Sequence, residues 1–168
     1  MITANITLGK NVEIDPTASV NNVSLGNNVR VRKYCSVFGA PSHPAIIGND
    51  SRINMMSILN GYDAPLVIGE RVGISQHVHI MTGSGPSASK KLQKIFAVIR
   101  EPVIIGNDCW IGADTIIMPN VTLADFCIVA ANSFVNKSFP EYSIIGGNPA
   151  KLIRSFTEEE IKKVHDES

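Results

Sequence analysis

The sequence repeats its aliphatic residues every six positions, and this period constrains the fold more than any other feature. The longest unbroken series comprises Ile105, Ile111, Ile117, Leu123, Val129 and Val135. A helix repeats apolar positions every three or four residues and a half-buried strand every two, so neither element alone has this period. A period of six fits short strands joined by turns. Each hexad then places one aliphatic residue in the interior and, four positions later, one small residue.

The hexads group in threes, which predicts a three-sided coil of 18 residues. Equivalent hexads begin at Leu8, Leu25, Ile47, Ile68, Ile105 and Leu123, and five of these six have glycine in second place. The extra residues between coils all follow the third hexad, and such one-edge insertions leave a stacked ladder intact. The sequence therefore predicts an all-β parallel β-helix. We expect a three-faced prism of about six coils, stacked about 4.8 Å apart, with one long edge loop.

The repeat fades after Val135, and a short helix is expected near the C-terminus. Thr157 and Glu160 are spaced for a capping box, and Phe156 and Ile161 for a hydrophobic staple. We assign residues 1–154 to the β-helix domain, with its edge loop at 82–104. Residues 155–168 form the C-terminal helix and tail.

Composition argues against several classes of function. The 15 basic and 15 acidic side chains give no surplus of positive charge, which nucleic-acid binding requires. No apolar run approaches the roughly 20 residues that cross a bilayer, and no signal segment follows Met1. We therefore expect a cytoplasmic protein without membrane insertion. Cys109 and Cys127 lie 18 positions apart; a redox or metal pair is one interpretation, and small buried residues are the favoured one.

The motifs between Ile68 and Arg154 resemble those of the hexapeptide-repeat acyltransferases. The most specific are "IGNDCWIGADTIIMPNVTL", "IVAANSFVNKS" and "GGNPAKLIR". The chain is similar to the maltose/galactoside and polysaccharide-biosynthesis O-acetyltransferases. This resemblance implies a left-handed β-helix, whereas the general crossover rule would predict a right-handed one. It also implies a homotrimer that binds acetyl-CoA in grooves between neighbouring prisms, needs no metal, and acts on a small-molecule or glycan acceptor.

The resemblance assigns candidate cofactor-binding residues by position. They are Trp110, Ala113, Ala131, Asn136, Lys137 and Arg154. Trp110 matches the tryptophan beside the pantetheine arm of CoA, and a packing role is the alternative for this single tryptophan. Arg154 matches an arginine near the nucleotide phosphates. Ordinary solvated charge is the alternative for Lys137 and Arg154.

The candidate acceptor site departs from the family pattern at one position. Asn54 and Asp63 fall near family residues that hold the sugar, and Gly85 in "IMTGSGPSASKK" stands where the family has its catalytic histidine. That histidine takes the proton of the acceptor hydroxyl as it attacks the thioester. His43 is the first substitute, with Asp63 placed to orient it, and His79 of a neighbouring subunit is the second.

The leading hypothesis is an acetyl-CoA-dependent O-acetyltransferase that acts on a hydroxyl of a sugar or glycan precursor. The second is a weakened or inactive homologue, which Gly85 favours; Gly85→His should then restore activity unless this glycine has a positive φ. A zinc hydratase needs three converging imidazoles, but the chain offers only His77, His79 and His43. A purely structural solenoid would carry flat threonine ladders, and none is visible.

Overall fold

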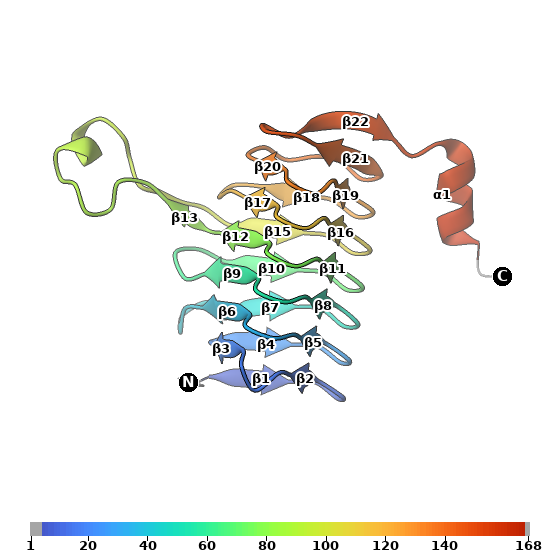
Figure 1. Cartoon of the computed structure of the whole chain (residues 1–168), viewed down its shortest axis with the longest axis horizontal. Coiled ribbons are helices and arrows are strands. Elements are labelled where there is room, and N and C mark those ends of the chain that lie inside the picture. Colours follow the sequence, from blue (N-terminus) through green and yellow to red (C-terminus); the bar gives the residue numbers. More distant parts are fainter. Residues whose placement is uncertain (1–4, 167–168) are drawn as a thin grey trace.

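The computed structural model describes residues 5–166, which form a left-handed parallel β-helix with three faces (Figure 1). Each of six complete coils contributes one strand to each face, as the sequence predicted.

The three faces are named A, B and C in the order in which the chain visits them. Face A consists of β1 (Ile6–Leu8), β4 (Val23–Leu25), β7 (Ala45–Ile47), β10 (Leu66–Ile68), β15 (Val103–Ile105) and β18 (Thr122–Leu123). Face B begins with β2 (Glu13–Ile14), β5 (Arg30–Val31), β8 (Arg52–Ile53), β11 (Gly73–Ile74), β16 (Trp110–Ile111) and β19 (Ile128–Val129). Face C consists of β3 (Ser19–Asn21), β6 (Ser36–Gly39), β9 (Ile58–Gly61), β12 (His79–Met81), β17 (Ile116–Ile117) and β20 (Phe134–Val135).

The interior is a set of ladders in which inward residues of successive coils stack in register. On face A, Ile68 pairs with Ile105, and Ile105 pairs with Leu123. All three side chains are buried. The small hexad positions also point inward, and Cys109 and Cys127 are buried one coil apart. The six-residue period therefore predicted the core correctly.

The corner between faces A and B explains the Gly-Asn pattern of the hexads. A Cβ on Gly48 would lie 2.6 Å from the carbonyl carbon of the next coil, so only glycine allows this close approach. Asn28 and Asp50 follow with left-handed backbones, at φ of 57° and 59°, which asparagine and aspartate tolerate best after glycine. The backbone N–H of Asn27 donates to the side-chain oxygen Oδ1 of Asn49 at 2.8 Å, so a side chain of one coil also binds the backbone of the next.

Every insertion lies at the edge where face C turns back to face A, which we call the insertion edge. The longest insertion, residues 82–102, is called the arm. It leaves the prism as an antiparallel pair of β13 (Gly83–Ser84) and β14 (Ile99–Arg100), with a 3₁₀ turn, η1 (Leu92–Lys94), near its tip. Figure 1 shows that the arm projects away from the side of the prism opposite to face B.

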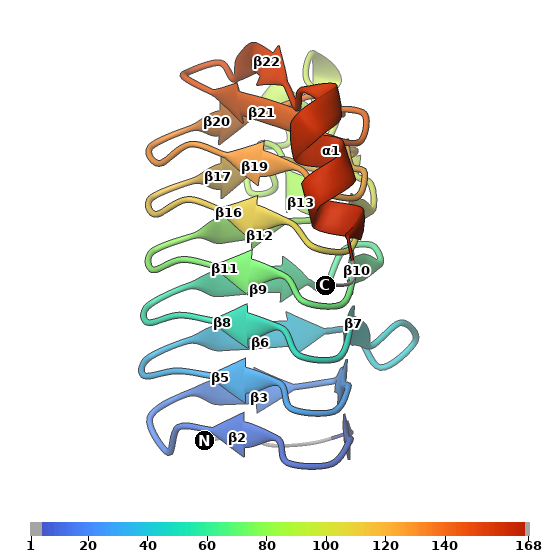
Figure 2. The ribbon, with the colours of Figure 1, turned by 90° about the vertical axis from the view of Figure 1, so that its right-hand side faces the viewer.

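A hairpin and a helix close the C-terminal end. β21 (Ser143–Gly146) continues face B, and β22 (Lys151–Ser155) pairs with it in antiparallel register. α1 (Glu158–His165) begins at Thr157 with the predicted capping box and runs down in front of the upper coils (Figure 2). Its last turn is held by Tyr142, whose hydroxyl lies 2.8 Å from His165 Nε2. No helix within residues 5–166 is long and apolar enough to cross a membrane.

We predict that stability depends on the depth of each inward residue in the stack. Leu59 is fully buried, so Leu59→Ala should lower the free energy of unfolding by about 2–5 kcal/mol. Leu8 occupies an inward position in the first coil but is 51% exposed, so Leu8→Ala should cost less than about 1 kcal/mol. Urea unfolding followed by circular dichroism would measure both. Equal losses would contradict the ladder model of the core.

Candidate functional site

Face B presents the indole of Trp110 to the outside. The strand below carries Gly73 in register with Trp110, and a Cβ there would lie 3.8 Å from the indole Cδ1. The indole nitrogen donates to Ser75 Oγ at 3.2 Å, and the side chain remains 57% exposed. The ring thus lies over a strand without a side chain, with one broad surface free. This favours a ligand-facing role over the packing role.

Arg154 lies in the same column of face B as Trp110. Trp110 pairs with Ile128, Ile128 with Ile144, and Ile144 with Arg154. The guanidinium forms two hydrogen bonds to the Glu160 carboxylate, at 2.7 and 2.9 Å. This ion pair raises the pKa of Arg154 and lowers the pKa of Glu160 to about 2. Arg154 is therefore a fixed, charged group that also ties α1 to the body.

Three other predicted residues lie beside this column. Ala113 and Ala131 occupy the corner that follows face B in successive coils, where the Asn132 amide donates to the Ala113 carbonyl at 2.8 Å. Asn54 follows β8, the strand of face B that lies two coils below Trp110. Its side-chain amide donates to the Ile74 carbonyl at 2.9 Å. Face B and its corner therefore bring together most of the predicted cofactor residues and one predicted acceptor residue.

Asn136 and Lys137 do not join this group. They are exposed residues that follow β20, the last strand of face C. Lys137 Nζ lies 5.4 Å from the centre of the Phe139 ring, a cation–π contact at the insertion edge. Within one chain, this pair is therefore separated from Trp110 by the body of the prism.

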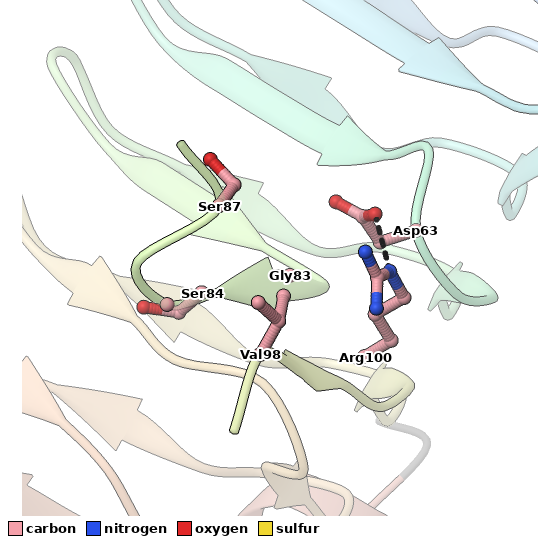
Figure 3. A pocket seen from close by; sticks show the side chains of 7 residues that line it. Asp63, Gly83, Ser84, Ser87, Val98 and Arg100 are labelled. Carbon is pink, nitrogen blue, oxygen red and sulfur yellow. Dashed lines mark hydrogen bonds and ion pairs between the residues drawn. The ribbon is translucent and has the colours of Figure 1, made fainter. Parts of the chain in front are cut away.

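A pocket of about 130 Å³, which we call the arm pocket, lies at the root of the arm (Figure 3). Its lining consists of Asp63, Gly83, Ser84, Gly85, Ser87, Val98 and Arg100. Asp63 comes from the connection between β9 and β10, and Arg100 from β14. The Arg100 Nε donates to Asp63 Oδ1 at 3.2 Å, so an ion pair joins the arm to the body of the prism.

Two glycines are required by the geometry of this pocket. Gly85 has a φ of +149°, and a Cβ on it would lie 2.8 Å from Val98 Cα. A side chain at position 85 is therefore strained as well as crowded. Substitution by histidine would distort the arm, so restoring an imidazole there is not the simple test that the sequence suggested. At Gly83, a Cβ would overlap the carboxylate of Asp63.

None of the chain's four histidines lines the arm pocket. His43 lies at the insertion edge, with Nδ1 2.9 Å from Ser42 Oγ and Nε2 3.1 Å from the Tyr62 carbonyl. Since a carbonyl only accepts, Nε2 carries the proton and Nδ1 accepts from the serine hydroxyl. Asp63, expected to orient His43, instead pairs with Arg100.

The other histidines lie elsewhere. His79 is half-buried on the outer surface of face C, in register with Ile58 and Ile116. His77 lies at the corner between β11 and β12, where its Nδ1 is 3.3 Å from Asp114 Oδ1. His165 is in α1. Residues 5–166 contain no cluster of three or more His, Cys, Asp or Glu side chains that could hold a metal ion.

The cysteines behave as interior residues. The hydrogen bond with Cys127, together with burial, raises the pKa of Cys109, and burial raises the pKa of Cys35. The same hydrogen bond lowers the pKa of Cys127, whose side chain is fully buried. A buried, protonated thiol, as at Cys35 and Cys109, is neither a good nucleophile nor a metal ligand. These observations favour the interpretation of the cysteines as small residues that fill the corners.

Sequence reasoning missed Arg100, Ser84 and Ser87 as pocket residues. All three belong to the arm, which carries no six-residue period from which a position could be inferred. The one available signal was the pair of glycines, Gly83 and Gly85, which marks a close approach of the backbone.

A six-coil left-handed parallel β-helix, with an exposed tryptophan on one face and a pocket at the insertion edge, defines the class of hexapeptide-repeat transferases. The family described as "Bacterial transferase hexapeptide (six repeats)" matches residues 96–137. WcaF of Escherichia coli, assigned to colanic acid biosynthesis as an acetyltransferase, is 31% identical over 156 residues, 91% of this chain and 71% of WcaF. The chain belongs to the hexapeptide-repeat acyltransferases.

Solved structures agree with this assignment. AntD, an N-acyltransferase from Bacillus cereus in complex with dTDP and 3-hydroxybutyryl-CoA, is 26% identical with a TM-score of 0.81, over 96% of this chain and 88% of AntD. A variant of AntD was solved with dTDP-4-amino-4,6-dideoxyglucose and coenzyme A. A hexapeptide-repeat acetyltransferase of Vibrio cholerae, complexed with acetyl coenzyme A, is 27% identical with a TM-score of 0.63, over 92% of this chain and 72% of that one.

We predict that a side chain at position 85 distorts the arm. Gly85→Ala should lower the free energy of unfolding by about 1–3 kcal/mol, because of the positive φ and the contact with Val98. It should also speed tryptic cleavage at Lys90 and Lys91. Gly73→Ala is the matched control, since a Cβ there meets only an ordinary contact. An arm as resistant in Gly85→Ala as in the native protein would show that glycine is not required.

Proposed function

We propose that the chain transfers an acetyl group from acetyl-CoA to a sugar or glycan precursor. The observation that carries this proposal is the column on face B, where an exposed indole over Gly73 is in register with Arg154. The indole offers a flat apolar surface to the pantetheine arm, and the guanidinium offers a partner to a phosphate. The acetyltransferase assignment of WcaF and the CoA complexes of AntD and the Vibrio cholerae protein support it.

The proposed site uses two copies of the chain. Face B with Trp110 and the insertion edge with Asp63 lie on opposite sides of one prism. An acceptor in the arm pocket therefore cannot reach a thioester beside Trp110 of the same chain. In a homotrimer, the arm pocket of one copy can face the Trp110 column of the next, and the arm can bridge them.

The arm has the surface that such an assembly needs. It carries exposed apolar side chains, namely Leu92, Ile95 and Phe96 near its tip and Ile99 in β14. Exposed apolar patches of this kind mark interaction sites. We assign this tip to the contact with the neighbouring copy.

A second candidate function is CoA binding without efficient transfer. The absence of an imidazole from the lining of the arm pocket and the conformation of Gly85 favour it. Both candidate functions include CoA binding, but only the first includes efficient acetyl transfer. CoA binding and acetyl transfer therefore need separate measurements.

The proposed cofactor site predicts CoA binding that can be measured by the fluorescence of the single tryptophan. CoA should quench Trp110 saturably, and Arg154→Ala should weaken binding by about tenfold through loss of a phosphate partner. Glu160→Gln removes the charge that pairs with Arg154 but keeps the guanidinium, so it should bind CoA nearly as well as the native chain. Failure of CoA to quench Trp110, or equal weakening by both variants, would count against the assigned groove.

The proposed two-copy site predicts that the arm is needed for assembly of the homotrimer. Replacing Ile95 and Phe96 together by aspartate should shift the protein toward monomers in light scattering, because charged groups would face an apolar contact. Acetyl transfer should fall with the loss of trimers. Lys90→Ala and Lys94→Ala, on the same arm, serve as controls that leave its apolar side chains in place. A native protein that is monomeric at micromolar concentration would contradict the two-copy site.

A further inference from the structure

The arm pocket has an unusual set of polar groups for transfer to a hydroxyl. Its charged side chains are Asp63 and Arg100, and its hydroxyls are Ser84 and Ser87. His43 uses both ring nitrogens outside the pocket. The one base that this chain itself contributes to the lining is thus a carboxylate.

The position of Asp63 leaves part of this carboxylate available. Oδ1 accepts from Arg100, while Oδ2 has no hydrogen-bond partner within residues 5–166. Gly83 makes room for the carboxylate directly against β13, where any side chain would overlap it. Figure 3 shows one oxygen directed toward Arg100 and the other directed away from it. The carboxylate is therefore oriented by one partner and open to a second.

The chemistry of a carboxylate favours a particular acceptor. A carboxylate is a weaker base than an imidazole and gains little from a neutral hydroxyl. An ammonium group, by contrast, is attracted by its charge and already carries the proton that must leave. We infer that the arm pocket binds its acceptor through a primary amine and that Asp63 receives a proton from it. This inference rests on the proposed acetyl transfer and replaces the hydroxyl acceptor expected from the sequence.

The step balances with Asp63 carrying one proton from nitrogen to sulfur and water accepting the other. The ammonium gives one proton to the carboxylate, and the neutral nitrogen then attacks the carbonyl carbon of the acetyl thioester. As the C–N bond forms and the C–S bond breaks, sulfur leaves with the electron pair and takes the proton from Asp63. The second proton on nitrogen passes to water. The products are an acetamide, the free thiol of CoA and an ionised Asp63.

Amino sugars are the acceptor class that this inference names. The proposed function already names a sugar or glycan precursor as the acceptor, and an acceptor bound through a primary amine is then an amino sugar. The complex of an AntD variant with an amino-sugar nucleotide and coenzyme A provides a suitable probe.

The test uses acceptors that differ only in amine and hydroxyl. The native protein is assayed with acetyl-CoA against dTDP-4-amino-4,6-dideoxyglucose and dTDP-6-deoxyglucose, and against glucosamine and glucose. Thiol release and mass spectrometry of the product report transfer. We expect amine members to be acetylated and hydroxyl members to be inert. Asp63→Asn should lower amine transfer by about 100-fold or more, with the quenching of Trp110 by CoA unchanged.

Arg100→Gln separates the chemical role of Asp63 from its structural role. Both substitutions break the ion pair that ties the arm to the body, but Arg100→Gln keeps the carboxylate. We expect it to lower amine transfer by less than about tenfold. Equal losses in the two variants would show that Asp63 only tethers the arm and would overturn the inference.

Three further outcomes would contradict the inference. Transfer to the hydroxyl members at equal or higher rate overturns the amine assignment and leaves acetyl transfer standing. A protein that binds acetyl-CoA but acetylates no amine of the panel likewise overturns it. Absence of CoA binding removes the proposed function itself, and the inference with it.

Discussion

The register of the inward ladders is the constraint on which the rest of the molecule depends. Each coil closes only if its aliphatic residues stack on those of the coil below, as Ile68 does with Ile105. Outward residues then fall into columns without further cost. The column of Trp110, Ile128, Ile144 and Arg154 is such a by-product of core packing. A ligand-binding face arises because the interior fixes the position of every exterior side chain.

The same constraint confines irregular structure to one edge. An insertion within a face would break two ladders at once, so extra residues collect where face C returns to face A. His43, Asp63 and the arm all lie there, in successive coils. The chemistry that a regular solenoid lacks is therefore concentrated at the insertion edge. The proposed cofactor binding then belongs to the ordered columns of face B, and the proposed acceptor binding belongs to the loops on the opposite side.

The sequence predicted what the period governs and little of what lies outside it. The coils, the buried cysteines and the cap at Thr157 follow from local spacing, and the structure confirms them. Asp63 and Arg100 are 37 residues apart and meet because the arm folds back on itself, which no repeat encodes. A side chain at Gly85 would likewise meet Val98 across the arm. The sequence indicated a missing histidine at this position but not the backbone that excludes one.

Folding and function therefore draw on different interactions. Each coil is stabilised by its neighbours along the stack, so the prism needs no second chain to bury its core. The proposed site, in contrast, needs the arm pocket of one copy and the Trp110 column of another. Exposed apolar side chains on the arm then have a cost in the isolated chain and a use in the assembly. Substitutions in the arm should thus affect transfer while leaving the coils intact, which separates loss of the site from loss of the fold.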